Sequence, residues 1–311
     1  MRRSRKTDWM RRLVRENSLS SNDFILPIFV TEGKNKKIPI KTMPEVFRYS
    51  VDKLGQIVDR ALKLKIPMVA IFPQTNSGLK DSYGSEALNE NNLVCKAIRK
   101  IKDKYKNEIG IMTDVALDPY TSHGHDGILR SKSILNDETI EILIQQSLLQ
   151  AQMGSDVIAP SDMMDGRIGE IRQELDNNSL KDIKILSYAV KYASSFYGPF
   201  RDAVGSKKSL KGDKKTYQMD FSNSEEALRE VALDIKEGAD LVMVKPGLPY
   251  LDIIKKVKEN FKIPVLAYQV SGEYSLLMNG INKGLINENS IYETLMSVSY
   301  THLTLPTSNS V

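Results

Sequence analysis

The stretch Asp240-Leu241-Val242-Met243-Val244-Lys245 decides the fold class. It places four apolar residues in a row between an aspartate and a lysine. A helical pattern, Ser224–Glu237, precedes it and ends at Gly238, a residue type that commonly terminates helices, and another, Leu251–Asn260, follows it. A strand without polar alternation is typical of a parallel sheet that is buried on both faces. The stretch therefore predicts one strand of an α/β sheet.

Six further runs of the same kind occur along the chain, and helical patterns separate them. The other predicted strands are Ile25–Val30, Met68–Phe72, Gly110–Leu117, Asp156–Ser161, Lys184–Tyr192 and Pro264–Ser271. The other predicted helices are Lys53–Lys65, Ser85–Tyr105, Glu138–Met153, which Asn136-Asp137-Glu138 is expected to cap, and Gly166–Leu175. Such a series favours a closed (β/α)8 TIM barrel over an open doubly wound sheet. No glycine-rich dinucleotide motif follows any of these strands, which agrees with the barrel.

Composition limits the class of protein. The 311 residues suit a single barrel domain, and 41% hydrophobic with 27% charged residues exclude a disordered or fibrous chain. No apolar run approaches the roughly 18 residues of a membrane span, so we expect no membrane association. The single cysteine, Cys95, excludes an internal disulfide and a cysteine-rich zinc site. We expect a cytoplasmic protein.

Basic residues are concentrated at the N-terminus. Residues 1–15 hold seven of the 44 lysines and arginines but only one acid, Asp8. No nucleic-acid-binding motif follows, so we interpret residues 1–24 as an arm that packs on a neighbouring subunit or stays solvated, and expect no nucleic-acid partner. Residues 25–297 form the predicted catalytic barrel, and residues 298–311 a tail.

Two of the predicted strands end in lysine. Lys191 lies late in the fifth strand and Lys245 ends the sixth. Active sites of barrels lie at the C-terminal ends of the strands, so the two ammonium groups are expected to converge. Lysines are rarely buried, and two close ammonium groups depress each other's pKa. A neutral amine is the form that attacks a ketone to give a Schiff base; the alternative is that both lysines extend into water.

Charged loops follow the neighbouring strands. The third strand leads into a loop with Asp114, Asp118 and Asp126. Their carboxylate oxygens are suited to binding Mg²⁺; the alternative is an ordinary turn rich in Asp and Gly. The loop after the fifth strand carries six basic residues, which either bind carboxylates or form a solvated charge run. They are Arg201, Lys207, Lys208, Lys211, Lys214 and Lys215.

Together these strings resemble the porphobilinogen synthase family, also called 5-aminolevulinate dehydratase. The resemblance rests on the segments 114–126, 159–166, 186–201, 241–247 and 267–274, in order, and extends over roughly residues 5–298. It implies that two molecules of 5-aminolevulinate condense to porphobilinogen with loss of two waters, through Schiff bases on two lysines, in tetrapyrrole (heme) biosynthesis.

The resemblance also implies roles for individual residues. Lys245 corresponds to the lysine that holds the first substrate, and Lys191 to the one that holds the second. Arg201 and Lys214 match lid residues that bind the second substrate's carboxylate, and Ser271 matches a ligand of the first substrate's carboxylate. The family assembles into octamers through its N-terminal arms, so a homo-octamer is expected.

The metal content is expected to differ from that of zinc-dependent members of the family. Those members carry three cysteines where this chain has Ala116, Asp118 and Asp126, so no catalytic zinc is expected. Glu230 matches the family's allosteric Mg²⁺ ligand.

Two other functions remain open from the residues alone. A Schiff-base aldolase acting on a sugar phosphate would use one such lysine, but no convincing phosphate-binding glycine pair is present near Ser271. The second alternative is a non-catalytic assembly subunit that folds but is inactive. The eighth strand is expected to be missing or replaced, because the family's final strand, with its tyrosine, does not follow the helix expected near Glu288. Tyr300–Leu305 is a candidate replacement, and reduced stability and activity are expected without the family's strand.

Overall fold

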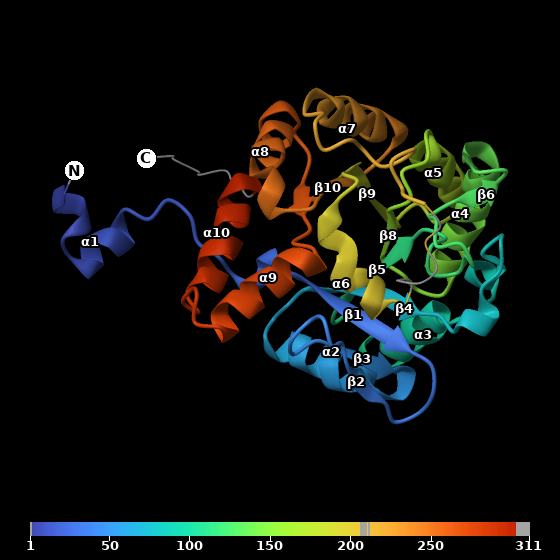
Figure 1. Ribbon diagram of the computed structural model, residues 1–311, viewed down its shortest axis with the longest axis horizontal. Coiled ribbons are helices and arrows are strands. Elements are labelled where there is room, and N and C mark those ends of the chain that lie inside the picture. Colours follow the sequence, from blue (N-terminus) through green and yellow to red (C-terminus); the bar gives the residue numbers. More distant parts are fainter. Residues whose placement is uncertain (1, 206–209, 211, 303–311) are drawn as a thin grey trace.

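Seven parallel strands form the frame of the molecule and confirm the predicted α/β barrel architecture. The structure is a computed structural model that describes residues 2–205, 210 and 212–302. Neighbouring strands follow one another around a common interior (Figure 1). They are β1 (Ile25–Thr31), β4 (Met68–Gln74), β5 (Gly110–Val115), β8 (Val157–Pro160), β9 (Lys184–Lys191), β10 (Leu241–Lys245) and β11 (Val265–Ala267). All seven predicted strands are confirmed, although the last is shorter than expected.

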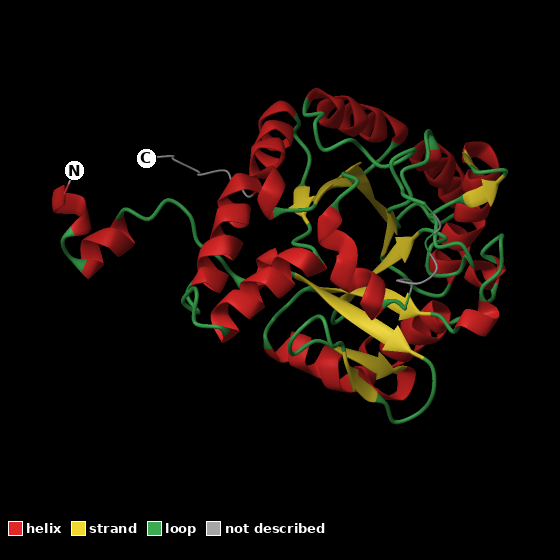
Figure 2. Cartoon of the chain, in the orientation of Figure 1, coloured by secondary structure: helices red, strands yellow, loops and turns green. Residues whose placement is uncertain are grey.

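Helices surround this sheet on the outside (Figure 2). The predicted ones are α2 (Leu54–Lys63), α3 (Leu93–Tyr105), α4 (Asn136–Gln152), α5 (Arg167–Asn177), α7 (Glu225–Glu237), α8 (Leu251–Asn260) and α10 (Ser290–His302). Two further helices lie near the strand ends, α6 (Gly198–Ala203) and α9 (Ser271–Asn282). Short 3-10 turns are η1 (Arg2–Arg5), η2 (Ser21–Asp23), η3 (Val51–Lys53), η4 (Ser77–Leu79), η5 (Ser85–Leu88), η6 (Ser195–Tyr197) and η7 (Leu248–Tyr250).

Side-chain capping explains where the helices depart from the predictions. The helix expected over Ser85–Tyr105 is interrupted, because the Asn92 side chain accepts a hydrogen bond from the Cys95 amide at 2.8 Å and starts α3 anew. Asn136 does not cap α4: it is the first helical residue, and its side-chain oxygen accepts from the Asp165 amide instead. Gly238 ends α7 with φ 107°, as predicted.

Four short strands were not predicted, because runs of three or four residues give little periodicity. The strands β2 (Lys37–Pro39) and β3 (Phe47–Ser50) pair antiparallel with each other, and β3 extends the sheet beyond β1. A separate hairpin joins β6 (Ile128–Arg130) and β7 (Ser133–Leu135) in the loop that follows β5.

The barrel is open between β11 and β1 in the described part of the chain. β11 pairs only with β10 there, and β1 pairs with β4 and β3. A cavity of about 210 Å³ lies between them, lined by Ile25, Leu266 and Val298 among others. Residues Tyr300–His302 end α10, so this part of the candidate replacement strand is helical. Residues 303–311 of the tail, like Lys207, Lys208 and Lys211, lie outside the described residues.

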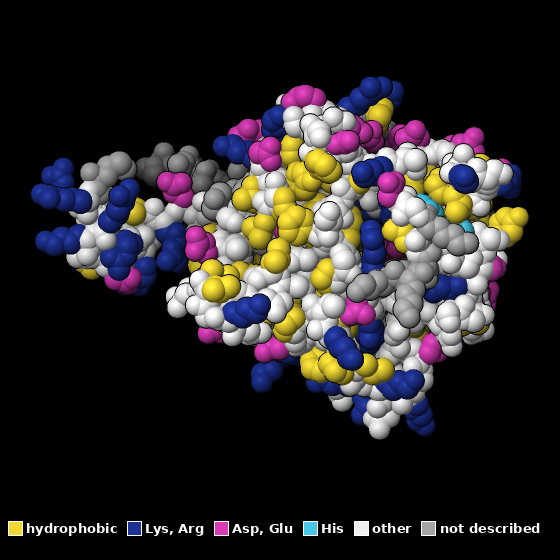
Figure 3. Space-filling model, in the orientation of Figure 1, with side chains coloured by type: hydrophobic (Ala, Val, Ile, Leu, Met, Phe, Trp, Pro, Cys, Tyr) yellow, Lys and Arg dark blue, Asp and Glu magenta, His cyan; other side chains and the backbone are white. Residues whose placement is uncertain are grey.

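The N-terminal arm stands away from the barrel. Its helix α1 (Asp8–Leu13) projects from the body in Figure 1, and Figure 3 shows the basic side chains that cover it. The side chains of Trp9 and Leu13 are 59% and 74% exposed. In the ranges 2–205 and 212–302, no helix is long and apolar enough to cross a lipid bilayer.

Candidate active site

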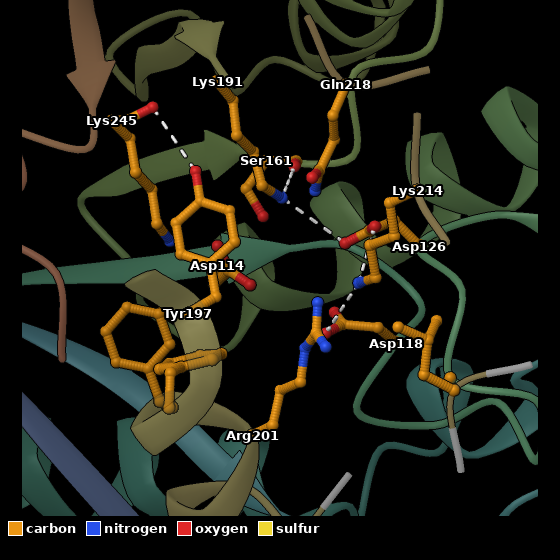
Figure 4. Close-up of a pocket in the computed structure, with 14 residues that line it drawn as sticks. Asp114, Asp118, Asp126, Ser161, Lys191, Tyr197, Arg201, Lys214, Gln218 and Lys245 are labelled. Carbon is orange, nitrogen blue, oxygen red and sulfur yellow. Dashed lines mark hydrogen bonds and ion pairs between the residues drawn. The ribbon is translucent and has the colours of Figure 1, made fainter. Parts of the chain in front are cut away.

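Lys191 and Lys245 converge as predicted, because the strands that they end are hydrogen-bonded neighbours. The parallel register of β9 and β10 places Lys191 directly beside Lys245. Both side chains enter one pocket at the C-terminal face of the sheet (Figure 4). Lys191 is 5% exposed and Lys245 7%. The alternative that both lysines extend into water is therefore wrong.

Lys191 lies among oxygen atoms. Its Nζ donates to the carbonyl oxygen of Ser161, which follows β8, and forms an ion pair with Asp126 Oδ1 at 3.4 Å. The other carboxylate oxygen of Asp126 is 2.8 Å from Lys214 Nζ. Burial alone would raise the pKa of Asp126, but the ammonium groups of Lys191 and Lys214 hold that pKa well below its usual range. Asp126 is thus a charged bridge between two lysines.

Lys245 lies among aromatic rings. Its Nζ is 5.1 Å from the ring centroid of Tyr188, 5.4 Å from Tyr197, 5.3 Å from Phe200 and 4.6 Å from Tyr268. Burial, and then the ammonium of Lys191, lower its pKa to about 7, although the nearby aspartates oppose the shift. A large share of Lys245 is therefore a neutral amine at neutral pH.

The three predicted acids line the same pocket. Asp114 is the last residue but one of β5, and burial raises its pKa to about 6 while the Lys245 ammonium opposes the rise. Asp118 lies 3.5 Å from Lys214 Nζ. The described parts of the chain contain no group of three or more His, Cys, Asp and Glu side chains placed to hold a metal ion. Asp118 and Asp126 are neutralised by lysines instead.

The remaining predicted site residues divide into one that reaches the pocket and two that do not. Arg201 of α6 lines the pocket, with its side chain directed toward Asp118 (Figure 4). Ser271 starts α9 outside the pocket, and its Oγ accepts from the Phe200 amide at 2.7 Å. Glu230 is on the outer helix α7, where burial, followed by the charge of Asp234, raises its pKa.

Several pocket residues were missed by sequence reasoning. Tyr197 and Phe200 belong to the run Phe196-Tyr197-Gly198-Pro199-Phe200, whose clustered aromatics after a strand end were a usable signal. Gln218 carried no such signal, since single amides in loops are common. The other missed lining residues are Phe72, Gly124, Ser161 and Leu210. About 40 Å³ of space is free among all these side chains, which is room for a few water molecules.

Comparisons of this chain with known proteins agree with one another on a single family. The family model described as delta-aminolevulinic acid dehydratase matches residues 1–301. The delta-aminolevulinic acid dehydratase of Bradyrhizobium diazoefficiens is 55% identical over 297 residues, which are 95% of this chain and 84% of that protein. The Rhodobacter capsulatus enzyme of the same name is 48% identical, over 96% of this chain and 90% of its own.

A solved structure matches the fold over nearly the whole chain. It is the delta-aminolevulinic acid dehydratase (porphobilinogen synthase) of Toxoplasma gondii in complex with the reaction product porphobilinogen. Its TM-score is 0.93 at 44% identity, covering 97% of this chain and 86% of that one.

Proposed function

The chain belongs to the delta-aminolevulinic acid dehydratase family, and we propose that Lys245 and Lys191 carry its reaction as two Schiff-base lysines. The enzyme is a lyase of porphyrin biosynthesis, a porphobilinogen synthase that condenses two molecules of 5-aminolevulinate. The observation that carries the proposal is the pairing of two buried lysines across adjacent strands. Both substrates are ketones, which accounts for two amines where an aldolase uses one.

Each lysine acts as a nucleophile toward one substrate ketone. The neutral Nζ adds to the carbonyl carbon, and the carbonyl oxygen leaves as water to give an imine. A carbon–carbon bond and a carbon–nitrogen bond then form between the two substrates, and both lysine amines are released unchanged. The overall balance is two 5-aminolevulinates to one porphobilinogen and two waters. The lowered pKa of Lys245 supports its taking the first substrate.

Charged side chains around Lys191 are proposed to orient the second substrate. Arg201 and Lys214 would bind its carboxylate, since both line the pocket and both are cations. Ser271 lies outside the pocket but contacts Phe200, which lines it, and its hydroxyl proton would bind the first substrate's carboxylate, because its oxygen already accepts from the Phe200 amide. Fixing two small flexible acids in this way converts their reaction into an effectively intramolecular one.

The metal requirement is proposed to be magnesium without catalytic zinc. Glu230 is a half-buried carboxylate beside Asp234, and Mg²⁺ commonly takes one or two carboxylates and completes its shell with water. A bound Mg²⁺ would supply positive charge that offsets the repulsion between these acids. Zinc would need softer donors than Asp118 and Asp126, which Lys214 already neutralises.

A chelator and one substitution test the metal proposal. Activity should survive a zinc-selective chelator, and Glu230→Gln should lose stimulation by Mg²⁺ while keeping its magnesium-free rate. Glu259→Gln, on the exposed surface of α8, is the matched control and should respond to Mg²⁺ like the parent. Activity restored only by Zn²⁺, or full stimulation of Glu230→Gln, would contradict this assignment.

We further propose a homo-octamer formed through the N-terminal arms, in the cytoplasm. The arm's exposed Trp9 and Leu13 support a partner surface for it, because large apolar side chains on a projecting helix are costly in water. The single buried thiol of Cys95 is compatible with a reducing compartment. Light scattering of the parent and of a Trp9→Ser, Leu13→Ser variant would test the assembly.

Borohydride reduction with 5-aminolevulinate, followed by peptide mapping, tests the catalytic proposal. Reduction of an imine fixes the substrate to the lysine, so label is expected on Lys245 and on Lys191. An aldolase would be labelled only with a phosphosugar, and an inactive subunit would not be labelled. Absence of label at both lysines would overturn the proposal.

A further inference from the structure

Lys80 is a half-buried lysine at the catalytic face that the mechanism above does not use. It follows η4, just beyond the C-terminal end of β4. Its Nζ is inaccessible to solvent and has no hydrogen-bond partner within the described chain. Burying an ammonium group without a partner costs free energy. A second side-chain conformation in which the ammonium group of Lys80 is paired would avoid this cost.

Backbone pairing holds Lys80 next to the acidic loop. The adjacent Asp81 forms a parallel bridge with Thr121, and its amide donates to the Tyr120 carbonyl at 3.3 Å. The Ser122 amide donates back to the Asp81 carbonyl at 2.7 Å. Burial lowers the pKa of Lys80, and the charge of Asp118 opposes this shift. Asp118 is therefore the carboxylate whose charge acts on the ammonium group of Lys80.

Lys214 forms an ion pair with Asp118 in the structure. Its Nζ is 3.5 Å from Asp118 and 2.8 Å from Asp126, and its side chain is 11% exposed. The free space of about 40 Å³ holds a few waters but not two substrate molecules. Substrate entry thus requires side chains of the pocket to move, and a Lys214 that turns to a substrate carboxylate leaves Asp118 without its partner.

We propose that Lys80 is a positioning residue that pairs with Asp118 when Lys214 turns to the carboxylate of the second substrate. This inference rests on the proposed role of Lys214. The exchange leaves Asp118 paired with one ammonium group in each state: with that of Lys214 before binding, and with that of Lys80 after it. Lys80 thereby lowers the cost of releasing Lys214, and its effect falls on substrate binding rather than on the bond-forming steps.

A double-mutant cycle tests the exchange. Lys80→Met keeps the length of the side chain and removes its charge, and it should raise KM for 5-aminolevulinate by about tenfold while kcat changes by less than about threefold. Lys80→Arg, which can still pair with a carboxylate, should restore most of the affinity. In an Asp118→Asn background, Lys80→Met should raise KM no further, because the carboxylate with which Lys80 would pair is already gone, while Asp126 still holds Lys214. Lys96→Met, on the exposed face of α3, is the control and should match the parent.

Three results would overturn the proposal: an unchanged KM in Lys80→Met, an equal KM increase in both backgrounds, or no recovery in Lys80→Arg. Thermal unfolding checks the fold, and Lys80→Gln carries the same test if Lys80→Met fails to fold. Borohydride labelling of Lys245 at saturating substrate separates this inference from the proposed function. Label in Lys80→Met together with an unchanged KM would reject the exchange alone, and no label in the parent would reject the Schiff-base proposal.

Discussion

The two lysines of the pocket lie side by side on paired strands, yet their surroundings are opposite. Lys191 contacts the Ser161 carbonyl and the carboxylate of Asp126, so its charge is compensated. Lys245 faces four aromatic rings, and no ion pair joins it to a carboxylate among the described residues. Burial is nearly equal for the two, at 5% and 7% exposure. Burial alone therefore does not determine how each amine behaves.

The difference lies in what replaces water around each ammonium group. A carboxylate attracts the ammonium group and so offsets part of the solvation energy that is lost on burial. Aromatic faces restore only part of it through cation–π attraction, so the pKa of Lys245 falls to about 7. The pocket thus holds one amine whose pKa is lowered and one that is paired with a carboxylate.

Removing each lysine in turn should separate the roles of Lys191 and Lys245 most clearly. Lys245→Ala should lower porphobilinogen formation by about a thousandfold or more and abolish covalent trapping of the first substrate. Lys191→Ala should lower turnover as strongly but leave borohydride label on Lys245. Steady-state assays with peptide mapping measure both effects. Near-normal turnover in Lys245→Ala, or loss of all label in Lys191→Ala, would show that the two amines are not independent sites.

Neutralising the bridge between the lysines should have the next largest effect. Asp126→Asn leaves Lys191 and Lys214 buried without their shared carboxylate, and breaking such a pair typically costs about 3–5 kcal/mol. We expect kcat/KM to fall by about a hundredfold or more, with label retained at Lys245 and reduced at Lys191. Equal loss of label at both lysines would instead indicate that the whole pocket had collapsed.

The pH dependence of covalent trapping at Lys245 tests the effect of its aromatic surroundings. Only the neutral amine attacks, and its pKa is lowered to about 7, so the rate of labelling should rise about tenfold from pH 6 to pH 8 and then level off. The Lys191 ammonium contributes to that lowering. In Lys191→Ala the midpoint should therefore move to higher pH. A midpoint that stays in place, or moves down, would remove Lys191 as a cause of the shift.

Sequence alone predicted the strand-end lysines, because parallel strands place their C-terminal ends at one face whatever the loops do. It also predicted the acids of the loop after β5. The aromatic surroundings of Lys245 were only partly within its reach: Tyr197 and Phe200 stand in one aromatic run after the fifth strand. Tyr188 and Tyr268 come from separate parts of the chain and join that run only in three dimensions. The same holds for Lys214, whose pairing with Asp118 and Asp126 depends on a contact across about a hundred residues. Ser271 was placed in a strand, but the carboxylate of Glu273 accepts from the Val270 amide and starts α9 there.

The smallest effect is expected from the hydroxyl of Tyr197, whose ring faces Lys245 while its oxygen faces away. The hydroxyl donates to the Tyr192 carbonyl at 2.8 Å and lies 3.4 Å from the Lys245 carbonyl, so it holds backbone rather than the amine (Figure 4). Tyr197→Phe keeps the ring and removes one buried hydrogen bond, which typically costs about 1 kcal/mol of stability. We expect a small fall in Tm, a two- to threefold change in kcat/KM, and an unchanged pH midpoint for trapping at Lys245. Tyr197→Leu removes the ring as well and should reduce activity further. If Tyr197→Phe alone moved the midpoint, the hydroxyl rather than the aromatic face would govern Lys245, and the contrast between the two lysines would need a different cause.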